Sequence, residues 1–496
     1  MTLASHWPRS PANPAGRARE NATRHSPDAP SAPRQRRRNH ICEYWRPEPP
    51  SHSATASSPE RGWYPSPPDE QPDVQTIDFA TILFLDPALL HHSLVETTPV
   101  TGTVPQYILQ LIGDLDEIRL TAARFFEHIH QWMPFISKKR FYDFYLQPSF
   151  HSRPDVVLLL LALKLITTFP PAGSRSPRTA LYNSTKQFYL KVEGSFSILV
   201  LQAGILVALY ELGHGIYPAA FLSIGTCARY AHALGINVSR TVVTRRVLTL
   251  VEVEERRRVW WAIVILDRFV SIGCPGRPFA TADPKLDDFL PADDAAWDQG
   301  IVKPDNFSTL SSPMTGHMSK FALLCQAARL LGQVLNHLST DFTSEDDWVQ
   351  LDRTLQSMLV AALNIDCPDY DQITFVYSAL VALYTPWLSS DRVQEIDTDR
   401  SHRVKVILQQ ITDRISANLI ERQCFLGRDP EGMSPWGLYF AYRICGAHMR
   451  TSHKSPHGLE VVRSLREGFM AIDVRWNVSG VYLQLLEAQE AINLAA

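Results

Sequence analysis

Apolar residues recur three and four positions apart through almost the whole chain after Thr76, and this spacing limits the possible folds more than any other feature. It places the apolar side chains on one face of an α-helix. We find no convincing apolar–polar alternation and no repeat of fixed period, so the sequence predicts an all-α body of many helices. The expected helices are 104–120, 122–135, 156–168, 197–212, 217–234, 252–272, 318–338, 345–363, 374–388, 401–423, 436–452 and 459–496.

Two of these stretches are apolar nearly all round. The run 156–169 is interrupted by Lys164, and the run 197–210 by Gln202. Both are shorter than the roughly 20 residues that cross a bilayer, so we expect buried helices, with 156–168 at the centre, and no membrane partner. The helices 197–212 and 217–234 are separated by a short turn and should form an antiparallel pair. Residues 274–305 are rich in Pro and Asp and should form a long loop.

The first seventy residues have a different composition, with 13 of the 35 prolines and almost no aliphatic residues. Such a segment cannot bury enough apolar surface to fold by itself. Residues 1–60 carry a net charge of +4, and the remaining residues carry −7. We therefore expect a disordered basic tail at 1–75 and a folded body at 76–496.

The tail's basic residues are densest at Arg34, Arg36, Arg37 and Arg38. They are candidates for nuclear import or for contact with DNA phosphates, which would give salt-dependent binding without base recognition. The alternative is a tail of common composition with no specific role.

No catalytic signature appears in the sequence. It contains no Gly-rich phosphate loop, no GxSxG and no HExxH. His128 and His130 lack a third ligand at useful spacing and should be ordinary helix histidines. We expect no catalytic residue, no bound cofactor and no metal ligand, although an enzyme site assembled from distant residues stays an alternative.

The most informative stretch runs from 201 to 291. Its second half combines a charged helix start, Trp260-Trp261, Asp267-Arg268, and the turn Gly276-Arg277-Pro278. We expect both tryptophans to be core aromatics. The run 255–258 should form ion pairs within a helix face, and Asp267 should accept hydrogen bonds from the backbone or an arginine of the following loop. Arg277 should brace that loop against Asp267 or Asp283.

This combination resembles the fungal-specific transcription factor domain, the middle homology region of fungal binuclear zinc-cluster regulators. The resemblance covers the motif core 121–291. It is carried by RRxWW followed by D and GRP at this spacing, with the motif residues Arg229, Arg257, Trp260, Trp261, Asp267, Gly276, Arg277, Pro278 and Pro291. The resemblance implies a regulatory domain that controls transcription through internal contacts, partners and a small-molecule inducer.

The family's DNA-binding module uses six cysteine thiolates to hold two Zn²⁺ ions, and so small a module does not fold without metal. The sequence has one cysteine, Cys42, before Cys227. Zinc would therefore be a cofactor only with a cluster outside this sequence. The segment 34–45 resembles the end of such a cluster or the residues directly after it.

Together these features predict a nuclear, pathway-specific fungal transcription regulator that is not an enzyme, serving a secondary-metabolite or carbon-use gene cluster. It would reach promoter DNA directly through the tail or through a homo- or heterodimer partner. A first alternative is a co-regulator without a cluster that binds a DNA-binding partner. A second is a helical metabolite-binding protein or enzyme.

Overall fold

The computed structural model describes residues 102–171, 176–237, 248–303, 308–312, 318–339, 345–364, 370–387, 429–451 and 456–495, with isolated positions at 81–85 and 402–410. The chain divides into two units, Met1–Asp73 and Val74–Ala496, and the described residues belong to the second. Arg34, Arg36, Arg37, Arg38 and Cys42 lie outside the described residues, as does nearly all of the expected helix 401–423.

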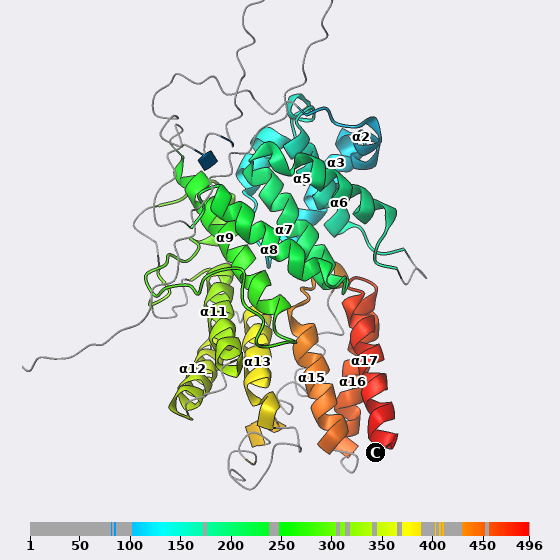
Figure 1. Ribbon diagram of the computed structural model, residues 1–496, viewed down its shortest axis with the longest axis vertical. Coiled ribbons are helices and arrows are strands. Elements are labelled where there is room, and N and C mark those ends of the chain that lie inside the picture. Colours follow the sequence, from blue (N-terminus) through cyan, green and yellow to red (C-terminus); the bar gives the residue numbers. More distant parts are fainter. Residues whose placement is uncertain are drawn as a thin grey trace, which may run out of the picture. The chain divides into compact units, whose positions relative to one another are not determined.

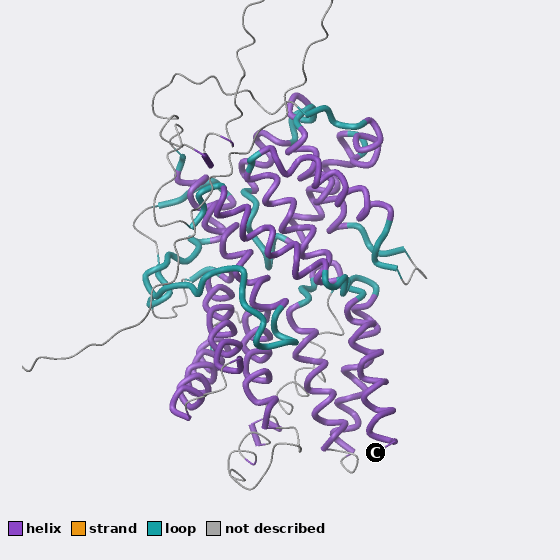
Figure 2. The backbone as a smooth tube through the Cα atoms, viewed as in Figure 1, coloured by secondary structure: helices purple, strands orange, loops and turns teal. Residues whose placement is uncertain are grey.

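The described residues confirm the all-α prediction: they form helices and connecting loops, and Figure 2 shows no strand among them. One isolated bridge joins Phe289 and Thr309. The α-helices are α2 (Gln106–Ile112), α3 (Leu115–Arg124), α4 (Lys138–Arg140), α5 (Pro154–Thr167), α6 (Ala180–Val192), α7 (Ile198–Gly213), α8 (Ala219–Ala233), α9 (Leu250–Val270), α10 (Asp294–Asp298), α11 (Lys320–Ser339), α12 (Glu345–Leu363), α13 (Tyr370–Tyr384), α15 (Trp436–Thr451), α16 (Pro456–Asp473) and α17 (Val478–Ala495). Short π- and 3₁₀-segments include η2 (Phe125–Ile129), η3 (Phe141–Tyr145) and η9 (Pro430–Gly432).

Two expected helices are each divided in two. The stretch 104–120 breaks into α2 and α3 at Gly113, whose φ is 85°, and Asp114 then caps α3 by accepting from the backbone N–H of Asp116 and Glu117. The stretch 459–496 breaks into α16 and α17 at Val474–Asn477, which we call the α16–α17 corner. Helix α6 was not expected from the sequence, and the short helix α10 lies inside the loop expected at 274–305.

Helices α5 and α7 form the centre of the body. Nearly every residue of both is buried, as expected for sequences that are apolar all round. They pack against each other more extensively than any other described pair of elements. Each fully buried Leu, Ile or Val contributes about 1.5–3 kcal/mol of transfer free energy, so this pair is a major source of the body's stability.

The other helices extend from this centre through a series of neighbouring contacts. Helix α8 packs on α7, α9 on α8, and α11 on α9. Beyond α11, the contacts continue through α13 and α15 to α17. Figure 1 shows α11–α13 and α15–α17 as two adjoining groups of helices. Among the described residues, none of the helices combines the length and apolarity that a membrane span requires.

The α16–α17 corner joins the C-terminal helices to the central pair. Arg475 donates from Nη2 to the carbonyl of Ile166 at 2.6 Å. Trp476 is fully buried and lies against Gly213 at the end of α7. His214, the next residue, is hydrogen-bonded through Nδ1 to the Asn477 side chain at 2.9 Å. The corner is therefore part of the core that α5 and α7 begin.

Replacing Gly213 with Ala should destabilise the body, because the new Cβ would lie 2.2 Å from Cε3 of Trp476. Overpacking of this kind costs about 1–3 kcal/mol. Gly225→Ala in α8 is the matched control, since a Cβ there meets nothing within 4 Å. It should leave stability unchanged or raise it by about 0.5–1 kcal/mol through helix propensity. Urea unfolding measures both, and equal stability of Gly213→Ala and the parent would contradict the packing.

Acid should destabilise the protein through His214. Burial lowers the pKa of His214 from 6.5 to about 3. Between these pH values the unfolded chain binds a proton that the folded chain does not, so the free energy of unfolding falls as pH falls, by up to about 1.4 kcal/mol per pH unit. His214→Gln should make the plot of unfolding free energy against pH shallower between pH 6 and pH 4. An unchanged slope would contradict this assignment.

Candidate functional site: the charge network of helix α9

Helix α9 begins with a polar half. Thr249 and Glu252 form a capping box, in which the Glu252 backbone N–H donates to the Thr249 hydroxyl and the Thr249 N–H donates to the Glu252 carboxylate. In the next turns of the helix, Glu254, Glu255 and Arg258 are all buried. A buried charge is costly unless it is paired and hydrogen-bonded, so the partners of these three residues define the site.

Glu254 and Arg258 form the first part of the network. Arg258 donates to Glu254 at 2.9 Å and to Asp294 of α10 at 2.7 Å. It also donates to the carbonyls of Pro134 and Ala292, and its guanidinium lies 4.1 Å from the centre of the Trp297 ring. One arginine thus joins α9, the segment after η2 and the loop after α9.

Glu255 forms the second part, on the side of α9 that faces the N-terminal helices. It pairs with Arg140 of α4 and accepts from the Ser137 backbone N–H at 2.9 Å. Gln202 of α7 donates to Glu255 at 3.0 Å and to the Phe135 carbonyl at 3.2 Å. Gln202, the polar residue that interrupts the apolar run 197–210, therefore connects α7 to this network.

Asp267 and Arg268 form the third part, near the end of α9. Asp267 accepts from the backbone N–H groups of Ala280 and Thr281 at 3.2 and 2.9 Å, which confirms the expected bonds from the following loop. Arg268 pairs with Asp267 at 2.8 Å and lies 3.8 Å from Asp283. We call these three parts together the α9 charge network.

The two tryptophans are core residues, as the sequence predicted. Trp260 and Trp261 are both buried. Trp261 also donates from Nε1 to the Phe289 carbonyl at 2.9 Å, which ties the loop after α9 to the helix. The described ion pairs of the run 255–258 reach outside it, contrary to expectation. Arg257 and Arg258 both pair with Glu254, and Glu255 pairs with Arg140 of α4.

The expectation for Arg277 was wrong. Arg268, not Arg277, lies against Asp267 and Asp283, while Arg277 is exposed and lies 5.7 Å from the centre of the Phe221 ring. Arg268 is on the helix face that the loop covers, whereas Arg277 is on the outer side of the turn.

The remaining motif residues lie apart from one another. Gly276 has a φ of 98°, which a side chain would strain, so the turn there requires glycine. Arg257 pairs with Glu254 at 2.5 Å and lies over the Phe289 ring. Arg229 and Pro278 are exposed, and Pro291 is buried. The structure does not gather these residues into one open site.

The fold brings to His128 two carboxylates that are distant from it in the sequence. Asp429 and Glu431 lie close enough that the three could hold a metal ion, with their ligand atoms within 4.8 Å of one another. His128 and Arg124 both already pair with Glu431, at 3.0 and 2.5 Å. The arginine's positive charge opposes a second cation there. His130 is buried and bonded to Asp298 at 2.8 Å, and burial lowers its pKa.

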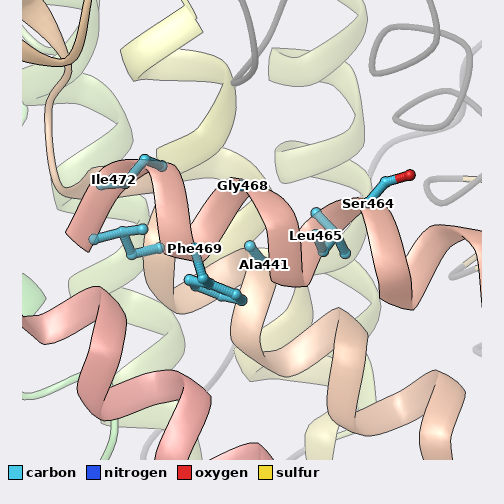
Figure 3. A pocket seen from close by; sticks show the side chains of 7 residues that line it. Ala441, Ser464, Leu465, Gly468, Phe469 and Ile472 are labelled. Atoms are coloured by element: carbon cyan, nitrogen blue, oxygen red, sulfur yellow. The ribbon is translucent and has the colours of Figure 1, made fainter. Parts of the chain in front are cut away.

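The cavity between α15 and α16 is too small for a ligand. Its volume is about 10 Å³, roughly the space of one water molecule. Figure 3 shows Ala441 of α15 beside Phe469 of α16, with Leu465 and Ile472 along the same helix. The lining is almost entirely apolar, so this space is a packing defect between helices.

The α9 charge network can hold helices and loops in register, but it offers no reactive arrangement. Its carboxylates accept hydrogen bonds from arginines and backbone N–H groups, and Arg258 and Arg268 are buried against aromatic rings. It is a structural site that fixes how the first helices, α9 and the following loop meet.

These observations define a class of protein: an all-α body with a buried charge network on the helix that carries the RRxWW motif. The family model for the fungal specific transcription factor domain matches residues 122–361, which include the whole network. The chain belongs to this family, whose domain is found in regulators of transcription.

Similar proteins are named as fungal transcription factors. Transcription factor BOA15 of Botryotinia fuckeliana is 36% identical over 152 residues, covering 30% of this chain and 84% of that protein. The pigment biosynthesis transcriptional activator pigB of Monascus ruber is 22% identical over 407 residues, covering 74% of this chain and 71% of that protein. Transcription factor tazR of Aspergillus terreus is 22% identical over 250 residues, 46% of this chain and 39% of that protein. No solved structure matches the chain.

Sequence reasoning did not identify Arg140 and Gln202 as members of the network. Gln202 carried a usable signal, because a lone amide in an apolar helix needs a buried hydrogen-bond partner. Arg140 carried none, because it lies in a short basic and aromatic segment where no helix was expected.

Arg258→Met should destabilise the body by about 3–5 kcal/mol, because Glu254 and Asp294 lose their pairing with the buried arginine and the Pro134 and Ala292 carbonyls lose their donor. Arg257→Met is the matched control. The Arg257 side chain is 14% exposed and makes one of its ion pairs with the same Glu254, so its loss should cost less. The double variant Glu254→Gln with Arg258→Met should recover part of the loss, since it removes a buried charge. Chemical denaturation measures all three, and equal losses for the two arginines would contradict the network.

Proposed function

We propose that this chain is a pathway-specific regulator of transcription that acts in the nucleus and has no enzymatic activity of its own. The observation that carries this proposal is the family match across the α9 charge network, together with a relative named as a pigment biosynthesis activator that aligns over 74% of this chain. By this proposal the helical body receives the regulatory signal, from a partner protein or a small-molecule inducer.

In this proposal, the basic tail or a dimer partner contacts the promoter DNA. The Arg34–Arg38 run would neutralise backbone phosphates, and each phosphate contact adds about 0.9 to the slope of log affinity against log salt. Such contacts position a protein but do not read bases. Sequence selectivity would therefore come from the partner or from a zinc cluster outside this sequence.

Deleting the gene tests regulation directly. Transcripts of a group of neighbouring pathway genes should change before their metabolites do, whereas an enzyme would change metabolites and leave those transcripts at their usual level. Changed metabolites with unchanged transcripts would contradict the proposal. The readout is RNA sequencing of matched cultures before product accumulates.

Substituting Arg36, Arg37 and Arg38 together with Ala should exclude the tagged full chain from the nucleus and lower the salt slope of its DNA binding by up to about 3. The matched control replaces Arg9, Arg17 and Arg19, which removes the same charge from the same tail. Fluorescence microscopy and gel-shift titrations give the two readouts. If both triple variants behave alike, the run has no special role.

A second candidate is a co-regulator that binds a separate DNA-binding protein. It is favoured by the single cysteine, Cys42, before Cys227, since a two-zinc cluster needs six thiolates. Sequence-specific binding by the purified chain that survives about 0.2 M salt would support direct DNA contact. Complete loss of binding by that concentration would favour the co-regulator, because purely electrostatic binding falls steeply over this range.

A further inference from the structure

A groove runs between α6 and α8, over the surface of α7. Both outer helices pack on α7, and the space between them has a volume of about 230 Å³. An engineered apolar cavity of about 150 Å³ holds benzene. The groove therefore has room for a substituted ring or a fused pair of rings, unlike the 10 Å³ space between α15 and α16.

The walls and floor of the groove are mostly apolar. Val207 of α7 forms part of the floor and is buried. Leu190 of α6 and Leu222 of α8 line the groove, and each is 62% exposed. Large apolar side chains exposed side by side along a concave surface are typical of a ligand site.

One part of the lining carries a positive charge held by a buried carboxylate. Lys186 of α6 pairs with Glu211 at 2.8 Å and donates to the Ser223 hydroxyl at 2.6 Å. Glu211 is fully buried and also accepts from the Tyr182 hydroxyl at 2.7 Å. A lysine has three donors, and the described contacts use two. The third is available to an oxygen acceptor in the groove.

A second polar group in the lining has no partner. The Tyr189 hydroxyl is buried and makes no hydrogen bond to any described residue. It reaches its place because residue 204 is glycine: a Cβ there would lie 3.1 Å from both the Tyr189 hydroxyl and the Cys227 sulfur. Because this oxygen has almost no exposed surface, it lies beneath the lining of the groove and not on its open face.

Cys227 lines the groove but does not offer it a nucleophile. Burial raises the pKa of the Cys227 thiol to about 12, and the thiol, unlike the thiolate, is a poor nucleophile. The groove therefore offers apolar walls, the ammonium donor of Lys186 and the exposed carboxylate of Glu193.

We propose that the α6–α7–α8 groove binds a compact, mostly apolar organic molecule of one or two rings that carries a carbonyl or carboxylate oxygen. The oxygen accepts from Lys186, and the ring system covers Leu190 and Leu222. The regulatory meaning of this site rests on the proposed inducer control, but the binding itself does not.

Titration of the purified full chain with naphthalene-1-sulfonate, followed by the probe's fluorescence, tests the site, because this probe joins a fused pair of apolar rings to an anionic oxygen acceptor. Thr226 lines the groove on α8, and Thr226→Trp should fill it and weaken probe binding at least tenfold. Gly225→Trp is the matched control, since Gly225 is the adjacent residue, does not line the groove and has open space around it. It should bind the probe as the parent does.

Equal binding by the two tryptophan variants would overturn the site. Leu190→Glu provides a second test at an exposed position, should Thr226→Trp not fold by circular dichroism, and it too should weaken the probe at least tenfold. Naphthalene has the same rings without the sulfonate and should bind at least tenfold more weakly. Equal affinity for both probes would overturn the acceptor requirement. None of these titrations depends on DNA or transcription, so their failure is distinct from failure of the proposed function.

Discussion

The fold depends on the pairing of Arg258 with Glu254 and Asp294 inside the body. Removing one partner from a buried pair leaves an uncompensated charge, which costs far more than a surface ion pair contributes. Arg258 also donates to two loop carbonyls, so the segment after η2 and the loop after α9 cannot move from α9 without breaking these bonds. Apolar packing gives the body most of its stability, and the network's hydrogen bonds join α9 to the segment after η2 and to the loop that follows the helix.

Helix bounds were predicted well wherever apolar spacing and polar ends mark them, as in α7 at the centre of the body, expected at 197–212 and observed at Ile198–Gly213. Helix α12 has one apolar face and flanking polar residues, and its observed bounds are those expected from the periodicity. The corner at Val474–Asn477 was not predicted because it contains neither Gly nor Pro and its apolar spacing continues into α17. Its geometry depends on Ile166 and Gly213, which are distant in sequence.

The sequence motif predicted which kinds of residue form the candidate site, but not all of their contacts. The motif correctly indicated a charged helix start, two core tryptophans and an aspartate that accepts from the following loop. The motif could not show which of two arginines, Arg268 at the end of α9 or Arg277 in the following turn, pairs with Asp267. That choice depends on how the loop after α9 folds back over the helix. Arg140 was missed because its role depends on a contact with Glu255, 115 positions away, and local spacing carries no information about such a contact.

The corner has a consequence for where this domain ends. Residues 122–361 carry the family match, but Trp476 occupies the space beside Gly213, and Arg475 satisfies a carbonyl at the end of α5. A fragment that ends at residue 361 would expose the end of α7 to water and leave the Ile166 carbonyl without the hydrogen bond from Arg475. The region that matches the family model is therefore smaller than the region that packs into one core. Insertions and fusions should therefore be better tolerated after α17 than at residue 361.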